Sequence, residues 1–429
     1  MYFKDLIKSL PSLKSKFGQG VIWNIGSLGI LGIVGILLNI LIARFYGAEI
    51  LGVFNQAFAF YILASQIAVW GMHFSVLKHI SQFSEDKKKC NSIISSSIIL
   101  TIVISLVISI IIYSLKGFFG GILGSENVKE AVGYIAPAIF FFAINKLLLY
   151  VLNGFRHMKN YAFSNALRYV MILVFLIIGI ILGVSGNTLP IIFTLGEFVV
   201  LCWLIISTSK LYSFTLNKFK EWAKKHLEFG NKIMLSGTLH ETNTRVDILM
   251  LGIFTSDAMV GIYSLASIIA EGVSMIYIAV KANVNPILTK LYFKKRIKKL
   301  REIIKKGVKA FYILMFAVVI ISIILYPFFL QIFMEDASFY ESWYIFIILL
   351  FGILLSSGYL PFNQILIQTG FPGWHTIMIA IVVASNILLN LIFIPLLGLY
   401  GAAIATSLSF IISMVILKVF VKKLIKIQV

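Results

Sequence analysis

Long apolar runs recur along this chain and constrain its fold more than any other feature. Each run is about 20 residues long, the length that an α-helix needs to cross about 30 Å of hydrocarbon. Lipid offers no partner to an unpaired backbone N–H or C=O, so these segments are expected to be helical. Twelve spans are predicted in the 429 residues: 18–43, 50–76, 91–115, 131–154, 161–184, 190–209, 233–254, 259–281, 310–334, 342–368, 374–396 and 399–420.

Composition supports an all-α polytopic membrane protein. Apolar residues make up 60% of the chain and charged residues 13%, whereas a soluble domain carries about a quarter charged residues. Nothing between the predicted spans is long enough to fold alone, so we expect no soluble domain. The first apolar run is too long for the core of a signal peptide, so we expect no cleavable signal.

The positive charges predict how the chain is oriented. With the N-terminus inside, 31 of the 37 Lys and Arg residues lie on the cytoplasmic side and 3 on the opposite side. This asymmetry predicts that both termini are cytoplasmic in a multi-pass protein of the inner membrane. The richest run, "TKLYFKKRIKKLREIIKKGVK" (289–309), is expected to form a basic amphipathic helix on the anionic leaflet, not a nucleic-acid site.

The seventh predicted span is unusually polar. Its sequence "GTLHETNTRVDILMLG" places His240, Glu241, Asn243, Arg245 and Asp247 near the middle of the membrane. At 100° per residue, His240, Asn243 and Asp247 share one face, and Glu241 and Arg245 lie on the adjoining one. Charges at this depth cost about 2.5–3.5 kcal/mol each and usually mark a cavity. We expect these residues to line one; the alternative is a self-neutralising charge cluster that joins helices.

Two further cations lie deep in predicted spans. Lys146 and Arg168 are on the fourth and fifth spans, each about 14 Å from the cytoplasmic surface at 1.5 Å per residue. Neither span supplies a nearby carboxylate, so the two cations suit a di-anionic ligand such as a pyrophosphate. The alternative is that they pair with Glu197 on the sixth span or Glu271 on the eighth.

The remaining polar groups in the spans suggest ion coupling but no catalysis. We expect Asp247 or Glu241, with Glu271 as a further candidate, to exchange protons or sodium, since a buried carboxylate can bind a proton. Asn24 is included among the cavity residues, although membrane asparagines more often bond between helices. The sequence has no P-loop and no H-x-x-x-H pair. We therefore expect no metal, no other cofactor and no enzyme activity.

The two halves of the chain resemble each other. The sequence "AEILGVFNQAFAF" opens the second span and "DAMVGIYSLASII" opens the eighth, which aligns Gly52 with Gly261. A second pair, "LGVSG" and "LGLYG", follows the fifth and eleventh spans. The repeat predicts two six-helix lobes, 1–209 and 233–429, joined by a basic cytoplasmic linker, 210–232. Two equivalent bundles of this kind favour alternating access to a site at the midplane.

Several segments together resemble one family of transporters. The sequence "RVDILMLGIFTSDAMVGIYSLAS" resembles the span 7–8 signature of the polysaccharide-repeat (O-antigen type) flippases, the oligosaccharidyl-lipid branch of the MOP/MATE-like superfamily. The sequence "ARFYGAEILGVFNQAFAF" resembles the span 1–2 hairpin of that family, and "LPFNQILIQTG" and "GLYGAAIATSLS" resemble its spans 10 and 12. The resemblance covers essentially the whole chain, in order.

This resemblance implies a fold and a function. It implies two lobes in a V-shaped, MATE-like arrangement that move an undecaprenyl-diphosphate-linked oligosaccharide repeat from the cytoplasmic to the outer leaflet for surface polysaccharide or lipopolysaccharide synthesis. It also implies a cationic central cavity, for which Lys146, Arg168 and Arg245 are the candidates, and contact with the machinery that polymerises the glycan.

Two alternatives belong to other functional classes. The first is a MATE-like antiporter that exports drugs or cations; such antiporters carry an acidic residue in span 1, and span 1 here has none. The second is a membrane-embedded glycan polymerase or ligase. Such enzymes present a large outer loop, and the outer loops predicted here are all short.

Overall fold

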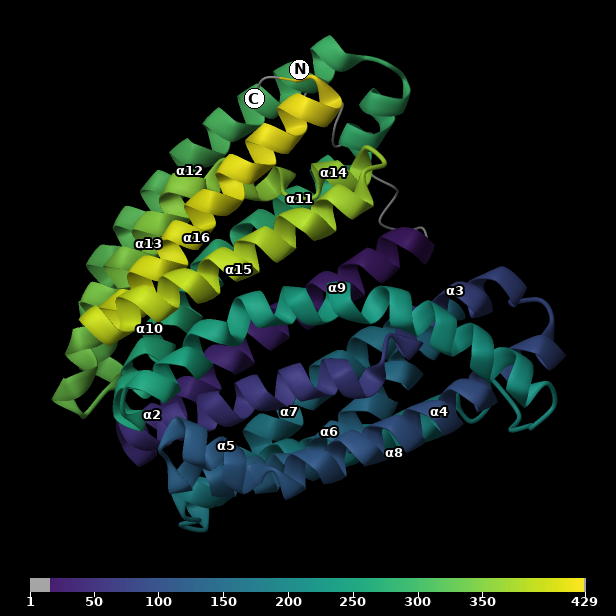
Figure 1. The fold of residues 1–429 in the computed structure, drawn as a ribbon, viewed down its shortest axis with the longest axis horizontal. Helices are drawn as coiled ribbons and strands as arrows, with labels where there is room; N and C mark the ends of the chain where they lie inside the picture. Colours follow the sequence, from purple (N-terminus) through teal and green to yellow (C-terminus); the bar gives the residue numbers. More distant parts are fainter. Residues whose placement is uncertain (1–15, 428–429) are drawn as a thin grey trace. The chain divides into compact units, whose positions relative to one another are not determined.

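The computed structural model describes residues 16–427, and this range contains no strand. The side chains of residues 16–22, 24, 25, 235, 236, 240, 279, 282 and 283 lie outside the description. Figure 1 shows the helices in order along the chain. They are α2 (Lys16–Val69), α3 (Met72–Phe83), α4 (Lys87–Ser114), α5 (Lys116–Leu123), α6 (Glu126–Gly154), α7 (Met158–Ile181), α8 (Ile191–Thr208), α9 (Phe219–Phe254), α10 (Asp257–Ser274), α11 (Ile276–Phe293), α12 (Ile297–Phe333), α13 (Ser342–Ser357), α14 (Ile365–Gln368), α15 (Pro372–Leu397) and α16 (Leu399–Phe420).

The helices account for the twelve predicted spans and confirm the all-α membrane fold. Ten helical segments of the described chain are long and apolar enough to cross a membrane. The number is lower than twelve for two reasons. The first two spans both lie in α2, where Gly47 (φ 81°, ψ −178°) interrupts the helical geometry between them. The seventh span is the second half of α9. Its polar residues make this segment less hydrophobic than the other spans, so it is not among the ten.

Three predicted spans are not single helices. The span 50–76 is divided between α2 and α3 at Trp70 and Gly71, and the span 259–281 passes from α10 to α11 at Met275.

The third span is interrupted over a longer stretch. Residues 342–368 were expected to be continuous, but α13 ends at Ser357 and α14 begins at Ile365. A short 3₁₀ turn, Leu360–Phe362, separates them. Pro361 lies in this turn; proline has no N–H to give to a helix and disfavours helical geometry in the residue before it.

The basic run 289–309 is also divided. Helix α11 ends at Phe293 and α12 begins at Ile297, with Lys295 in the left-handed conformation (φ 57°) between them. The expected amphipathic helix is therefore only the first turns of α12. Helix α12 is continuous over 37 residues. Its first turns carry the cations of this run, and its later turns form the apolar span.

The described chain folds into two compact units, each built from separate stretches of sequence. Unit 1 takes the described part of Met1–Leu38 with Phe60–Phe119 and Lys129–Gly237, and unit 2 takes Asn39–Ala59, Gly120–Val128 and Thr238–Val429. Most of the predicted first lobe is in unit 1 and most of the second in unit 2. Residues 210–232, predicted as the linker, belong to unit 1, where α9 begins at Phe219.

Unit 1 is held together by two apolar clusters. One gathers side chains of α3, α4, α6 and the first turns of α9, including Met72, Ile93, Leu147 and Trp222. The other packs α6 against α8 through residues such as Leu148 and Val200. Both clusters include positions on α6, so α6 is the central helix of this unit and carries polar side chains into its interior.

Unit 2 contains the glycine pair that the internal repeat aligns. Gly52 on α2 and Gly261 on α10 lie where these helices cross: a Cβ on Gly52 would overlap the carbonyl oxygen of Asp257, and a Cβ on Gly261 that of Ala48. Only glycine permits so close an approach, as in other membrane helix pairs. Hydrogen bonds secure the crossing, because the Asp257 carboxylate accepts from Gln56 Nε2 at 2.7 Å and from Ser125 Oγ at 2.5 Å.

Candidate functional site

Two buried polar clusters

A buried ion pair lies at the centre of unit 1. Arg168 on α7 is 7% exposed and Glu197 on α8 is fully buried; Arg168 Nε lies 2.5 Å from Glu197 Oε1. The Glu197 carboxylate also accepts from Tyr61 OH at 2.6 Å and from Asn145 Nδ2 at 2.7 Å. Four helices, α2, α6, α7 and α8, are thus joined at one carboxylate. The pairing of Arg168 with Glu197, which the sequence left as an alternative, is confirmed.

Lys146 lies beside this pair on α6. Its Nζ donates to Gln66 Oε1 at 2.8 Å and lies 5.5 Å from the ring centroid of Phe142. The Arg168 guanidinium carbon lies 4.6 Å from the same ring. Both cations therefore contact one aromatic side chain, which agrees with the equal depth predicted from helical rise. Lys146 is half-buried, and the group that accepts its hydrogen bond is a neutral amide.

The second cluster surrounds Asp247 in unit 2. Asp247 on α9 is 5% exposed, and its Oδ2 accepts from Tyr263 OH at 2.5 Å. Thr406 Oγ1 on α16 lies 3.4 Å from the same oxygen, and the backbone N–H of Ile248 donates to Oδ1 at 2.9 Å. All of these donors are neutral. The polar stretch of the seventh span thus delivers a carboxylate into the protein interior, where hydroxyl groups bind it.

Helix α15, which packs against α16, adds two buried amides to unit 2. Asn390 Nδ2 donates to Asn386 Oδ1 at 2.9 Å, and the two residues are 0% and 2% exposed. The Oδ1 atom of Asn390 is buried and has no hydrogen-bond partner. A buried carbonyl oxygen without a donor is costly to keep, and it is a group that a cation could satisfy.

Arg245 lies against an aromatic ring. Its guanidinium carbon lies 5.0 Å from the ring centroid of Phe58, and its buried Nε has no hydrogen-bond partner. Asp247, two residues along, takes its hydrogen bonds from Tyr263, Thr406 and Ile248. The charge of Arg245 also acts on Asp247, so the alternative in which Glu241, Arg245 and Asp247 neutralise one another stays a prediction.

The other predicted site residues are dispersed. Glu241 and Glu271 are half-buried on α9 and α10. Asn243 is half-buried, and its Oδ1 has no hydrogen-bond partner. His240 and Asn24 lie on α9 and α2, but their side chains are outside the described residues. Among the groups described, no three His, Cys, Asp or Glu side chains are placed to hold a metal ion.

Sequence reasoning missed several members of the two clusters. Tyr61 and Asn145 in unit 1, and Tyr263 and Thr406 in unit 2, are polar residues in apolar spans without any distinguishing motif. One signal was readable: the pair Asn386 and Asn390 in "SNILLN" is four residues apart, which places both amides on one helix face.

Similarity to known proteins

The sequence matches two protein families. Residues 17–292 match the family described as "Polysaccharide biosynthesis protein", and residues 233–396 match the MatE family. The first match covers well over half of the chain.

One curated relative and two solved structures extend this result. Over 386 residues the chain is 25% identical to the probable low-salt glycan biosynthesis flippase Agl15 of Haloferax volcanii, covering 87% of this chain and 77% of the relative. The fold is similar to lipid II flippase MurJ in an inward closed conformation, with a TM-score of 0.74, 20% identity, and 94% and 87% of the two chains covered. It is also similar to an inward-facing multidrug resistance transporter of the MATE family, with a TM-score of 0.77, 16% identity, and coverage of 89% and 92%.

The comparisons confirm the resemblance seen in the sequence. At these identities the structural similarities show the fold alone. The family match shows more, since it spans α2 to α11 and covers more than half of the chain. Transport proteins make up these families, which agrees with the expectation that the chain is not an enzyme. This multi-pass membrane protein therefore belongs to the polysaccharide biosynthesis protein family of the MOP superfamily.

Proposed function

We propose that this protein flips a lipid-linked oligosaccharide from the cytoplasmic to the outer leaflet, with an undecaprenyl-diphosphate-linked repeat unit for surface polysaccharide, such as an O-antigen, as the substrate. The family match and the similarity to a glycan biosynthesis flippase support the substrate class. The proposal places the protein in the inner membrane with both termini in the cytoplasm, where the substrate is assembled.

One observation carries the proposal: Lys146 and Arg245 are cations in membrane-spanning helices that aromatic rings contact. Lys146 lies over Phe142 and Arg245 over Phe58. A cation over a ring is stabilised by about 0.5–2 kcal/mol, which is less than the cost of holding a charge at that depth. A diphosphate oxygen that reaches either cation gains a charge-assisted hydrogen bond from it.

Arg168 has a different role in this proposal. Its charge is already balanced by Glu197, and it is almost completely buried. We propose that it supports the substrate site through Phe142, the ring that it shares with Lys146. Asn243, whose Oδ1 has no hydrogen-bond partner, and the half-buried Glu241 and Glu271 are proposed to contact the glycan or the coupling ion.

Asp247 is the proposed coupling residue. It is a buried carboxylate bonded only by neutral donors, and the amide oxygen of Asn390 is available in the same unit. A proton or a sodium ion bound at Asp247 would balance its charge. Binding and release of that ion would then drive the return of the empty transporter.

The proposal is tested by complementation. A strain that lacks its own repeat-unit flippase receives the wild-type chain, Lys146→Gln, Arg245→Gln, or the matched surface control Lys159→Gln. Restored surface glycan that is lost only with the two membrane variants, at equal protein level, supports the proposal. Restoration that is equal in all variants contradicts a cationic site. Donor repeat units of several structures are needed, because a mismatched glycan also prevents rescue.

A MATE-like antiporter is the second candidate, favoured by the MatE match over residues 233–396 and by the buried carboxylate Asp247 within it. The same strains distinguish the two functions. Increased resistance to cationic drugs that disappears with Asp247→Asn, without any glycan rescue, supports the antiporter.

A further inference from the structure

A pocket opens at the end of unit 2 where α16 finishes. It is a small, open pocket, lined by Ile304, Tyr359, Phe362, Ile365, Leu417, Lys418 and Val421. These residues come from α12, the turn between α13 and α14, α14 itself, α16 and the turn after it. Six of the seven are apolar or aromatic, so the wall suits a hydrocarbon surface.

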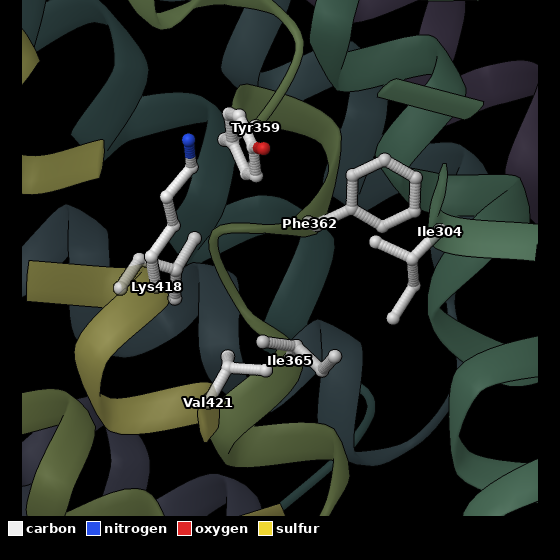
Figure 2. Close-up of a pocket in the computed structure, with 7 residues that line it drawn as sticks. Ile304, Tyr359, Phe362, Ile365, Lys418 and Val421 are labelled. Carbon is white, nitrogen blue, oxygen red and sulfur yellow. The ribbon is translucent and has the colours of Figure 1, made fainter. Parts of the chain in front are cut away.

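Lys418 is the one charged residue among those that line the pocket. Figure 2 shows its side chain extending alongside the ring of Tyr359, with Val421 and Ile365 below it and Phe362 and Ile304 across the pocket. Its Nζ lies 4.3 Å from the Tyr359 ring centroid. The aliphatic stem thus packs against apolar groups while the ammonium group lies against an aromatic ring, an arrangement typical of a lysine at a membrane interface.

Exposed cations extend this positive charge over the neighbouring surface. Arg301 and Lys305 flank Ile304 on α12, and Lys422 follows Val421; all three are exposed. The acidic residue of that part of α12, Glu302, is bonded to Lys306 at 2.6 Å. The surface around the pocket is therefore strongly positive.

Aromatic side chains mark this end of unit 2 as the level of the lipid headgroups. Trp374, at the start of α15, stacks edge-on against Phe420 with centroids 5.1 Å apart, and Lys423 Nζ lies 5.3 Å from its ring. Tryptophan and tyrosine beside lysine are typical of the boundary between hydrocarbon and water.

We propose that this pocket is a binding site for an anionic phospholipid of the cytoplasmic leaflet. The phosphate bonds to Lys418, which exchanges its contact with the Tyr359 ring for a charge-assisted hydrogen bond. The first carbons of an acyl chain lie against the half-buried ring of Tyr359 and the stem of Lys418. The inference rests on the proposed orientation with both termini in the cytoplasm. It does not depend on the transported substrate, because none of the seven lining residues belongs to the proposed transport site.

Direct binding to the purified full-length protein tests this site. The wild type, Lys418→Met and Lys422→Met are titrated in detergent with phosphatidylglycerol and with phosphatidylcholine, and bound lipid is counted by native mass spectrometry. Methionine keeps the stem of Lys418 and removes its charge, and Lys422 is a neighbouring lysine outside the pocket. A fourth protein, Val421→Phe, fills the pocket and keeps the charge.

We expect Lys418→Met to weaken binding of phosphatidylglycerol by about tenfold, and Lys422→Met to weaken it by less than about twofold. Val421→Phe should also weaken binding, and phosphatidylcholine should bind equally weakly to all four proteins. Equal losses for the two lysine variants would show a diffuse surface attraction and overturn the site. Equal binding of both lipids to the wild type would overturn the role of the phosphate charge. Transport can fail in any variant without changing this readout.

Discussion

The two units bury a carboxylate in opposite ways. In unit 1, Glu197 is in contact with the cation of Arg168 and accepts two further hydrogen bonds, so the charge is cancelled within the protein. In unit 2, Asp247 is equally buried, but every group that donates to it is neutral. The first arrangement fixes four helices in place, and the second leaves a charge that an ion or a proton can balance.

The cations differ in the same way. Arg168 in unit 1 forms an ion pair with its neighbour, while Arg245 in unit 2 lies against the ring of Phe58 and has a buried Nε without a hydrogen-bond partner. Lys146 is intermediate, since it bonds to the neutral Gln66. A charge that is satisfied internally contributes to stability, whereas a charge that is not can recognise a ligand. The predictions below test this division.

The largest effect is expected for Glu197→Gln. Removing one partner leaves Arg168 buried without a counter-charge, which costs about 3–5 kcal/mol. We expect low levels in membranes and a much lower Tm in detergent. The matched variant is Asp247→Asn in unit 2, where a neutral amide replaces a carboxylate bound by neutral donors; its Tm should stay close to that of the wild type. A similar loss of stability in both variants would remove the distinction between the two units.

The second effect concerns His226, another polar group buried in unit 1. Its Nε2–H donates to the Ile93 carbonyl at 3.1 Å, its Nδ1 accepts from Ser75 at 2.8 Å, and burial lowers its pKa to about 4. Between pH 6.5 and 4 the unfolded chain binds a proton that the folded chain excludes, so stability falls as pH decreases, by up to about 3 kcal/mol. Above pH 6.5 this contribution is complete.

The pH dependence of Tm measures this effect. His226→Gln should show a shallower decrease of Tm between pH 6.5 and 4 than the wild type. If both proteins have the same slope, the acid sensitivity arises elsewhere.

The third effect tests the helix crossing in unit 2. Gly52→Ala places a Cβ against the Asp257 carbonyl, and overpacking of this kind costs about 1–3 kcal/mol. Gly29→Ala on the same helix is the control, because nothing lies within 4 Å of an added Cβ there. We expect reduced Tm and transport for Gly52→Ala only. Equal behaviour of the two variants would show that α2 and α10 do not need this contact.

The fourth and smallest effect is a slower transport rate without a change in Tm. Lys146→Gln should reduce flipping by about tenfold, equivalent to about 1.4 kcal/mol of lost binding, with Tm unchanged. Lys159→Gln, at the exposed start of α7, should transport as the wild type does. A fall in Tm with Lys146→Gln would place this lysine with Arg168, as a structural group.

The sequence predicted the all-α membrane fold well because the hydropathy of each span can be read from the sequence alone. It failed where local geometry decides: the break between α13 and α14 at Pro361, and the turn at Lys295 that divides the basic run. It also predicted that Lys146 and Arg168 lie at matching heights, since helical rise is constant, and both cations contact the Phe142 ring. It could not decide between a ligand and Glu197 as the partner of Arg168, because that depends on the rotation of α7 and α8 about their axes.

The same limitation explains the site in unit 2. Asp247 stood out because it is a charge in an apolar context. The neutral residues that surround it, Tyr263 and Thr406, are common in membrane helices and become meaningful only when packing brings them to one carboxylate.

The most direct test of the account is to measure flipping of a diphosphate-linked oligosaccharide in proteoliposomes under imposed proton or sodium gradients. Wild-type protein and Asp247→Asn are compared at equal amounts and equal Tm. The account predicts that one of the gradients accelerates the wild type, and that Asp247→Asn flips slowly and does not respond to it. An Asp247→Asn protein that flips at the wild-type rate, with the same response to the gradient, would contradict the central claim that unit 2 carries the coupling carboxylate.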